Sequence, residues 1–200
     1  MIETIDSVDK QLLLFLNGFH NSFMDTVMWY TSSAPFWIPF YILLLFLIIR
    51  KGWSSEVTEN LKNIGFIIVS ISVAILLADQ ISSGFCKPFF ERLRPSHSPE
   101  LKGLVHLLSN TNGDIYRGGQ FGFVSSHAAN SFAIAWFVAA ILKSKKAWTV
   151  LLLWAATVSY SRIYLGVHYP GDIIGGTIVG ILSGYIAVKL YFYLSQKWLN

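Results

Sequence analysis

The stretch AWTVLLLWAATVSYSRIYLGVHYPGDIIGGTIVGILSGYIAVKLYFYL, which spans residues 147–194, consists of two long apolar runs joined by a short polar turn. The runs cover residues 147–165 and 173–194, and each is close to the length of about 20 residues that a helix needs to cross a bilayer. Ser161, Arg162, His168 and Asp172 lie at or near the turn. Ionisable side chains are costly beside lipid, so residues of this kind are candidates for a functional site.

Three further apolar runs, at residues 27–49, 64–85 and 124–142, are also long enough to be membrane helices. The first is the least regular, because residues 31–33 carry hydroxyl groups and prolines stand at positions 35 and 39. Of the 200 residues, 54% are hydrophobic and 13% are charged, against about 25% charged in an ordinary soluble domain. We therefore expect a single all-α domain, residues 1–200, built as a multi-pass bundle of five membrane helices.

The N-terminal segment has a different pattern. Its apolar side chains form one helical stripe, at Ile5, Val8, Leu12, Leu13, Phe15, Leu16 and Phe19. Asp6, Asp9 and Lys10 fall on the other side. This length and polarity are typical of a helix that lies in the membrane interface, so we expect residues 1–25 to form an interfacial helix. A short sixth crossing is the alternative.

Basic residues in short loops predict the orientation, because they are enriched on the cytoplasmic side of a membrane. They close the first run, separate the third from the fourth and follow the fifth: Arg50, Lys51, Lys143, Lys145, Lys146 and Lys197. Alternation of five spans places all of them in the cytoplasm. Segments 86–123 and 166–172 then lie together on the opposite, non-cytoplasmic face. A structureless loop as long as 86–123 is uncommon, so we expect it to form a partly structured cap.

The cations on that face suit the binding of a phosphoryl group, whose charge is spread over its oxygens. Lys87, Arg94 and Arg162 can supply positive donors, the arginines as planar forks and the lysine as a compact charge. Ser125 can add a hydroxyl group. The backbone N–H groups of Ser126 and His127 are predicted at a helix start, where such groups lack internal partners and favour anions.

Two histidines complete the candidate site. His168 and Asp172 are four residues apart, across the turn Tyr-Pro-Gly. If the carboxylate binds one ring nitrogen, it fixes the tautomer of the imidazole and leaves the other nitrogen free to attack. His127, at the start of another helix on the same face, would protonate the departing oxygen as a general acid.

These segments resemble the three signature motifs of the type 2 phosphatidic acid phosphatase (PAP2) superfamily, K-x6-R-P, P-S-G-H and S-R-x5-H-x3-D. Residues 87–95 match the first motif in full, and residues 161–172 match the third in full. The second motif departs from the pattern, because Val124 replaces its proline and Ser126 its glycine, whereas Ser125 and His127 are kept. Serine still offers a backbone N–H, so the departure concerns the geometry of the loop more than the reaction.

The resemblance implies a helical PAP2 core and a phosphatase that uses no metal or other cofactor and forms a phosphohistidine intermediate. By analogy, His168 is the nucleophile, Asp172 orients it, and His127 is the acid that later activates water. The phosphate would be held by Lys87, Arg94, Ser125, Ser126 and Arg162. The implied substrate is a lipid phosphate or diphosphate in the membrane. We favour undecaprenyl diphosphate, with lipid A phosphate and phosphatidylglycerol phosphate as alternatives.

A transporter or a lipid-binding membrane protein is the competing class. It predicts polar residues near the middle of several spans, and only Asp79 meets this expectation. Asp79 is either a functional residue or a local polar contact that orients its helix. The single cysteine, Cys86, excludes an internal disulfide and a multi-cysteine metal site. The dispersed formal charge of +4 gives no indication of nucleic-acid binding.

Two expectations concern packing. Gly176, Gly180 and Gly184 recur at four-residue spacing, which favours close approach between membrane helices. Glu91 and Arg92, inside the first motif, are expected to be solvated or paired with their neighbours. The sequence does not indicate an oligomeric state.

Overall fold

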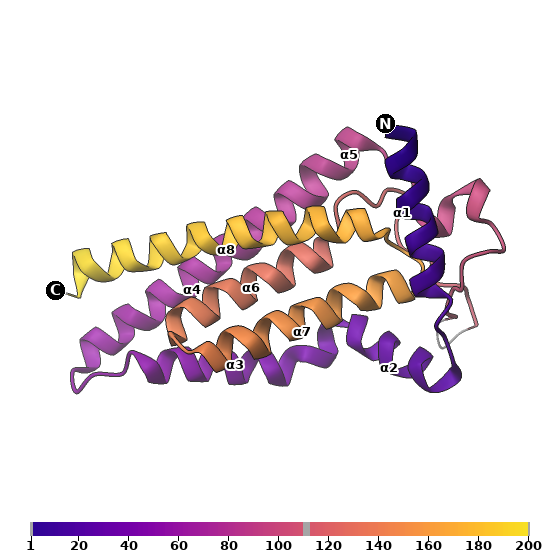
Figure 1. Cartoon of the computed structure of the whole chain (residues 1–200). Helices are drawn as coiled ribbons and strands as arrows, with labels where there is room; N and C mark the ends of the chain where they lie inside the picture. Colours follow the sequence, from indigo (N-terminus) through magenta and orange to yellow (C-terminus); the bar gives the residue numbers. More distant parts are fainter. Residues whose placement is uncertain (1, 110–112, 200) are drawn as a thin grey trace.

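The computed structural model describes residues 2–109 and 113–199, and within these ranges the chain is almost entirely helical (Figure 1). The α-helices are α1 (Ile2–Asn17), α2 (Ser22–Ser32), α3 (Ile38–Lys51), α4 (Val57–Asp79), α5 (Lys87–Phe90), α6 (Ser126–Leu142), α7 (Lys145–Tyr164) and α8 (Pro170–Trp198). In the described residues, β-structure is limited to isolated bridges between Leu93 and Phe121 and between Ser109 and Ile115. The expected all-α fold is confirmed.

Helix α6 lies at the centre of the bundle, where it packs against α4, α7 and α8 (Figure 1). Several of its side chains are fully buried: Ala128, Ala129, Ala133, Ala135, Phe137, Val138 and Ala139. A helix that is apolar on all sides is one that other elements surround. The start of α6 lies at the end of the bundle that α1 crosses, and the chain ends at the opposite end (Figure 1).

Three glycines of α8 allow this helix to lie directly against the backbone of α6. A Cβ atom added to any of them would clash with a carbonyl oxygen of α6 or of its N-cap residue. The glycines are Gly176, Gly180 and Gly184, and the carbonyl groups belong to Ser125, Ala129 and Ala133 in the same order. The expected close approach along this ridge is confirmed. The contact fixes the start of α8 relative to the start of α6.

Three segments are long and apolar enough to cross a membrane: Ala34–Lys51, Val57–Phe90 and Pro170–Trp198. They include most of the first predicted span and all of the second and fifth. Helix α6, which contains the third, is apolar but has only 17 residues. Large apolar side chains face outward on these elements, among them Ile42, Phe46, Leu76 and Ile178, each more than half exposed. Such exposure is typical of a surface that lipid covers.

The prediction of one helix over residues 27–49 is wrong. Helix α2 ends at Ser32, a 3₁₀ turn covers Ala34–Trp37, and α3 begins at Ile38. Pro35 lies at the start of the 3₁₀ turn and Pro39 at the start of α3, positions where the missing N–H is harmless. The indole of Trp37 donates a hydrogen bond to the carbonyl oxygen of Thr31 at 2.8 Å, which holds the two parts together.

The second predicted span is longer than expected. A π-helical segment, Gln80–Cys86, joins α4 to α5, so the helical path continues to Phe90 and ends at Glu91, whose φ is 46°. The loop predicted from residue 86 therefore begins at residue 91, and Lys87 belongs to a helix. A π-helical segment inside a helix is frequent at functional sites.

Helix α1 is tied to the same end of the bundle. Asn17 is 1% exposed, and its Nδ2 donates to the carbonyl oxygens of Tyr164 at 2.7 Å and His106 at 3.1 Å. Its Oδ1 accepts the backbone N–H of His106 at 2.7 Å. These bonds connect α1 to the end of α7 and to the loop that precedes α6.

Candidate active site

All eight predicted site residues lie at the end of the bundle where α1 crosses (Figure 1). They come from α5, from the loop after it, from the start of α6, from the last turn of α7 and from the turn into α8. Direct contacts join Arg94, His168 and Asp172 in one group and Lys87 and Ser126 in another. The fold therefore brings together side chains that are up to 85 positions apart in the sequence.

The imidazole of His168 is held between a carboxylate and a guanidinium group. Its Nδ1 lies 3.2 Å from Oδ2 of Asp172, and its Nε2 lies 3.1 Å from Nη1 of Arg94. Because a guanidinium group only donates, Nε2 is the acceptor and the ring proton is on Nδ1. Burial, together with the charges of Arg94 and Arg162, holds the pKa of His168 well below its ordinary value. The neutral ring therefore presents a lone pair at Nε2.

Asp172 is fully buried and has three hydrogen-bond partners. Besides His168, its Oδ2 accepts the backbone N–H of Tyr169 at 3.0 Å, and its Oδ1 accepts Nη1 of Arg92 at 3.0 Å. The expectation that Arg92 is solvated or paired with a neighbour in sequence is wrong. Its partners lie on α8 and α1, too far along the chain for a local pattern to reveal them.

The loop closes around Arg94, whose exposed fraction is 7%. Its Nε donates to the carbonyl oxygen of Phe121 at 3.0 Å. Gly118 has a φ of +67° and passes so close that an added Cβ would lie 2.8 Å from Nη1 of Arg94. The guanidinium group is thereby fixed beside Nε2 of His168.

Lys87 is positioned by two hydroxyl groups. Its Nζ lies 2.5 Å from Oγ of Ser126 and 3.0 Å from Oγ of Ser83. Ser83 in turn donates to Oδ1 of Asp79 at 3.3 Å. Ser83 was not among the predicted residues, although its four-residue spacing from both Asp79 and Lys87 on one helix was a signal for it. The serine that replaces the motif glycine thus contacts the motif lysine.

Ser125 acts first as a helix cap. Its Oγ accepts the N–H of Ala128 at 3.5 Å, and its own N–H donates to the carbonyl oxygen of Asp172 at 3.0 Å. The side chain is buried. It fixes the start of α6, where the free N–H groups of the first turn favour an anion, against the start of α8.

Arg162 is 2% exposed and is held by residues that the sequence motifs do not include. One Nη donates to Oγ of Ser32, and the other donates to the hydroxyl of Tyr116 at 2.9 Å. Its Nε has no hydrogen-bond partner among the described residues. Arg162, Ser32, Tyr116 and His127 line a cavity of about 200 Å³, so His127 and Arg162 share one small polar space.

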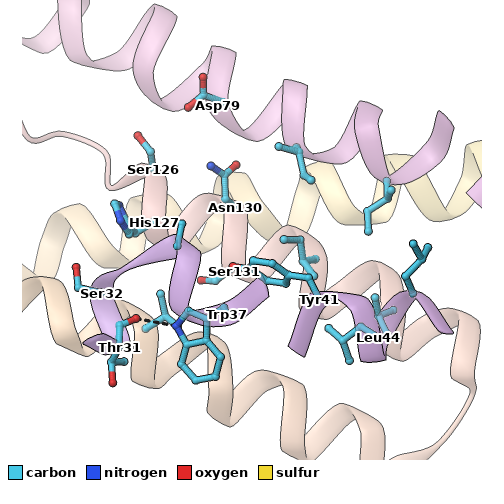
Figure 2. A pocket seen from close by; sticks show the side chains of 17 residues that line it. Thr31, Ser32, Trp37, Tyr41, Leu44, Asp79, Ser126, His127, Asn130 and Ser131 are labelled. Atoms are coloured by element: carbon cyan, nitrogen blue, oxygen red, sulfur yellow. Dashed lines mark hydrogen bonds between the residues drawn. The ribbon is translucent and has the colours of Figure 1, made fainter. Parts of the chain in front are cut away.

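A larger cavity of about 520 Å³ begins at Ser126 and His127 and extends between α3, α4 and α6 (Figure 2). Its far part is apolar, with Tyr41 and Leu44 among the lining residues, and its near part is polar. The polar lining consists of Thr31, Ser32, Asp79, Ser126, His127, Asn130 and Ser131. Oδ1 of Asn130 has no hydrogen-bond partner among the described residues. Such a mixed cavity suits an amphiphile.

The donor set of the site suits an anion. Arg94 contacts Nε2 of His168, and the charges of Arg162 and Lys87 also act on this imidazole. In the described part of the chain, no group of three or more His, Cys, Asp or Glu side chains is arranged to hold a metal ion. A phosphoryl group beside Nε2 of His168 would lie next to the guanidinium group of Arg94.

Comparisons with known proteins agree with this geometry. A family model described as the PAP2 superfamily matches residues 67–196. The chain is 37% identical to the lipid A 4′-phosphatase of Bacteroides thetaiotaomicron, over 98% of this chain and 81% of the relative. It is 36% identical to the lipid A 4′-phosphatase of Porphyromonas gingivalis, over 100% of this chain and 79% of the relative.

Two further similarities are weaker in sequence. The undecaprenyl-diphosphatase BcrC of Bacillus subtilis is 24% identical, over 84% of this chain and 75% of the relative. The crystal structure of Aquifex aeolicus LpxE superimposes with a TM-score of 0.59 at 26% identity, over 90% of this chain and 93% of that one. The predicted family resemblance is therefore confirmed.

Proposed function

We propose that this chain, which belongs to the PAP2 superfamily, is a membrane phosphatase that removes a phosphate group from a lipid A-type phosphoglycolipid. The sequence alone favoured undecaprenyl diphosphate, with lipid A phosphate as an alternative. The relatives that are 37% and 36% identical are lipid A 4′-phosphatases, whereas the undecaprenyl-diphosphatase of Bacillus subtilis is 24% identical. This difference favours the alternative over the first choice.

The observation that carries the proposal is the cavity beside His127. Its apolar part between α3, α4 and α6 has room for a lipid tail. Its polar part includes Oδ1 of Asn130, which has no hydrogen-bond partner among the described residues and calls for an N–H or O–H donor on the lipid. An acylated amino sugar carries such donors close to its phosphate, whereas a polyprenyl chain carries none. The polar wall therefore supports a glycolipid substrate.

The reaction proposed at this site has two displacements. In the first, Nε2 of His168 attacks phosphorus, the ester P–O bond breaks, and His127 gives a proton to the departing lipid oxygen. In the second, His127 takes a proton from water, the resulting hydroxide attacks phosphorus, and the P–N bond breaks to restore His168. Lys87, Arg94, Arg162 and the N–H groups at the start of α6 stabilise the charge on the phosphoryl oxygens throughout.

The orientation in the membrane is part of the proposal. The basic loops at residues 50–51 and 143–146 lie at the end of the bundle opposite the candidate site, which supports a cytoplasmic position for the loops and a periplasmic position for the site. We assign α1 to the membrane interface, segment 91–123 to a cap over the site, and five spans to the bundle of a bacterial inner membrane protein.

Phosphate release by the purified protein in detergent with EDTA tests the function. The substrates are bis-phosphorylated lipid A, undecaprenyl diphosphate and phosphatidylglycerol phosphate, and the variants are wild type and His168→Ala. We expect the highest kcat/KM with lipid A and no release by His168→Ala. Higher kcat/KM with undecaprenyl diphosphate would restore the first choice. No release from any lipid would favour a transporter or a lipid-binding protein.

A further inference from the structure

Arg92 links the buried carboxylate of the site to helix α1. Its Nη1 donates to Oδ1 of Asp172 at 3.0 Å. Its Nη2 lies 2.8 Å from Oδ2 of Asp9 and 3.1 Å from Oδ1 of Asp6. The planar guanidinium group thus uses one edge for the site and the other for α1, which is a geometry that lysine cannot reproduce.

Each partner further restrains this link. The Arg92 guanidinium lies 4.0 Å from the ring centroid of Tyr169, the residue whose N–H also binds Asp172. Asp9 accepts the backbone N–H of Gly171 at 2.8 Å, and an added Cβ at Gly171 would lie 2.7 Å from the Asp9 carboxylate. Helix α1 therefore contacts both Arg92 and the first turn of α8, which carries Asp172.

The two faces of α1 have opposite surroundings. Ile5, Val8 and Phe15 are each more than half exposed, whereas Asp6 and Asp9 face the bundle. Leu13, one helical turn after Asp9, is fully buried on the same side. The acidic face of α1 is the one that reaches the site. Hydrogen bonds and charge from Lys10 and Arg92 lower the pKa of Asp6, although burial acts in the opposite direction.

We infer that Arg92 is a positioning residue for Asp172, and that α1 belongs to the active site because Asp6 and Asp9 hold Arg92 in place. A fully buried carboxylate without its cation is strongly disfavoured. With Arg92 on Oδ1, Asp172 keeps Oδ2 directed at Nδ1 of His168, so the proton stays on Nδ1 and the lone pair on Nε2. This inference rests on the proposed phosphatase function and adds a role for the N-terminal helix.

Phosphatase kinetics of the full chain in detergent test the inference. We expect Arg92→Gln to lower kcat by on the order of 100-fold with little change in KM, since the guanidinium group is already bound by Asp6, Asp9 and Asp172. Arg92→Lys should recover only part of the loss, because an ammonium group cannot bridge Asp172 and the acidic residues of α1. Asp9→Asn should lower kcat by about 10-fold.

Two controls separate positioning from general loosening. Glu100→Gln removes another ion pair of α1, the one with Lys10 at 2.5 Å, without touching Arg92, and should leave kcat within about twofold. In an Arg92→Gln background, Asp9→Asn should have no further effect on kcat, because the two residues act in series. Full additivity of the two losses would mean that α1 does not act through Arg92.

A second measurement does not depend on turnover. The ¹⁵N NMR spectrum of histidine-labelled protein, with His168→Ala for assignment, should show the Nδ1–H tautomer of His168 in wild type and in Glu100→Gln. In Arg92→Gln the spectrum should show a mixture of tautomers. An unchanged tautomer together with an unchanged kcat in Arg92→Gln overturns the inference. If Arg92→Gln changes the tautomer but the wild-type chain hydrolyses no lipid, the inference stands and the proposed function is refuted instead.

Discussion

Nη1 of Arg94 lies 3.1 Å from Nε2 of His168, on the side of the ring opposite the carboxylate of Asp172. The lone pair of Nε2 and the cation that would attract a phosphoryl oxygen are thus adjacent. A phosphate bound by Arg94 would be presented to the nucleophile, and the guanidinium group would exchange its bond with Nε2 for a bond with phosphate.

The pH dependence of activity follows from this pair. Burial and the nearby arginines hold the pKa of His168 well below 6.5, so the ring stays neutral as the pH falls through that value. Arg94→Gln removes one cation, which raises the pKa of His168 and moves the acidic limb of kcat/KM against pH to higher pH. Profiles of both proteins between pH 4 and pH 8 check this. A limb that moves to lower pH in the variant would contradict it.

The same pKa affects stability. In the unfolded chain His168 binds a proton below about pH 6.5, whereas in the folded protein it does so only at much lower pH. The unfolded state then binds more protons, so the free energy of unfolding falls as the pH falls below about 6.5. Thermal unfolding of wild type and His168→Gln in detergent measures this, and the loss between pH 7 and pH 5 should be smaller in the variant.

Ser126 allows its hydroxyl and its backbone N–H to be tested separately. Ser126→Gly restores the motif glycine and removes the contact with Lys87, and it should keep kcat/KM within about threefold because the N–H remains. Ser126→Pro is compatible with the first position of a helix but lacks the N–H, so it should lower kcat/KM by on the order of 100-fold. Equal losses in the two variants would mean that the hydroxyl is the essential group.

The glycine ridge of α8 can be tested with a matched pair of substitutions. Gly180→Ala places a methyl group against the backbone carbonyl oxygen of Ala129. Because α6 and α8 would have to move apart to make room for it, the substitution should destabilise the protein by about 1–3 kcal/mol. Gly65→Ala on α4 meets no atom within 4 Å and should be neutral or slightly stabilising. Melting temperatures in detergent compare the two, and an equal shift would refute the packing argument.

The polar wall of the large cavity predicts substrate preference. Asn130→Leu removes an acceptor but keeps the number and branching of the side-chain heavy atoms, so it should lower kcat/KM for lipid A by about 10-fold or more and spare undecaprenyl diphosphate. Asp79→Asn gives a second variant on the opposite wall. If both substrates lose the same factor, the residues support Lys87 through Ser83 and do not select the lipid.

The helices, and the residues that come together in the candidate site, could be predicted because both depend on local patterns. Apolar runs indicated the helices α4, α6, α7 and α8, and three motifs indicated all eight site residues. The position of the break in the first span was harder to predict, because prolines such as Pro35 and Pro39 are tolerated at helix starts. The hydrogen bond from Trp37 to Thr31, which lies across the break, is visible only in the structure.

The supporting residues depend on contacts between distant segments. Arg92 meets Asp6 and Asp172, which are 86 and 80 positions away, so no local pattern links them. The π-helical segment that brings Ser83 and Lys87 together also has no clear sequence signal. Sequence patterns could thus identify the groups that would touch the phosphate, whereas the groups that orient them required the three-dimensional structure.

The order in which the site is completed follows from the position of α8. His168 precedes this helix and Asp172 lies in its first turn, so both follow the other six candidate site residues along the chain. A chain cut before α8 would keep His168 but lose Asp172 and the glycines that pack against α6. We therefore expect such a chain to lack the carboxylate that fixes the His168 tautomer, and to be inactive toward the lipids around it.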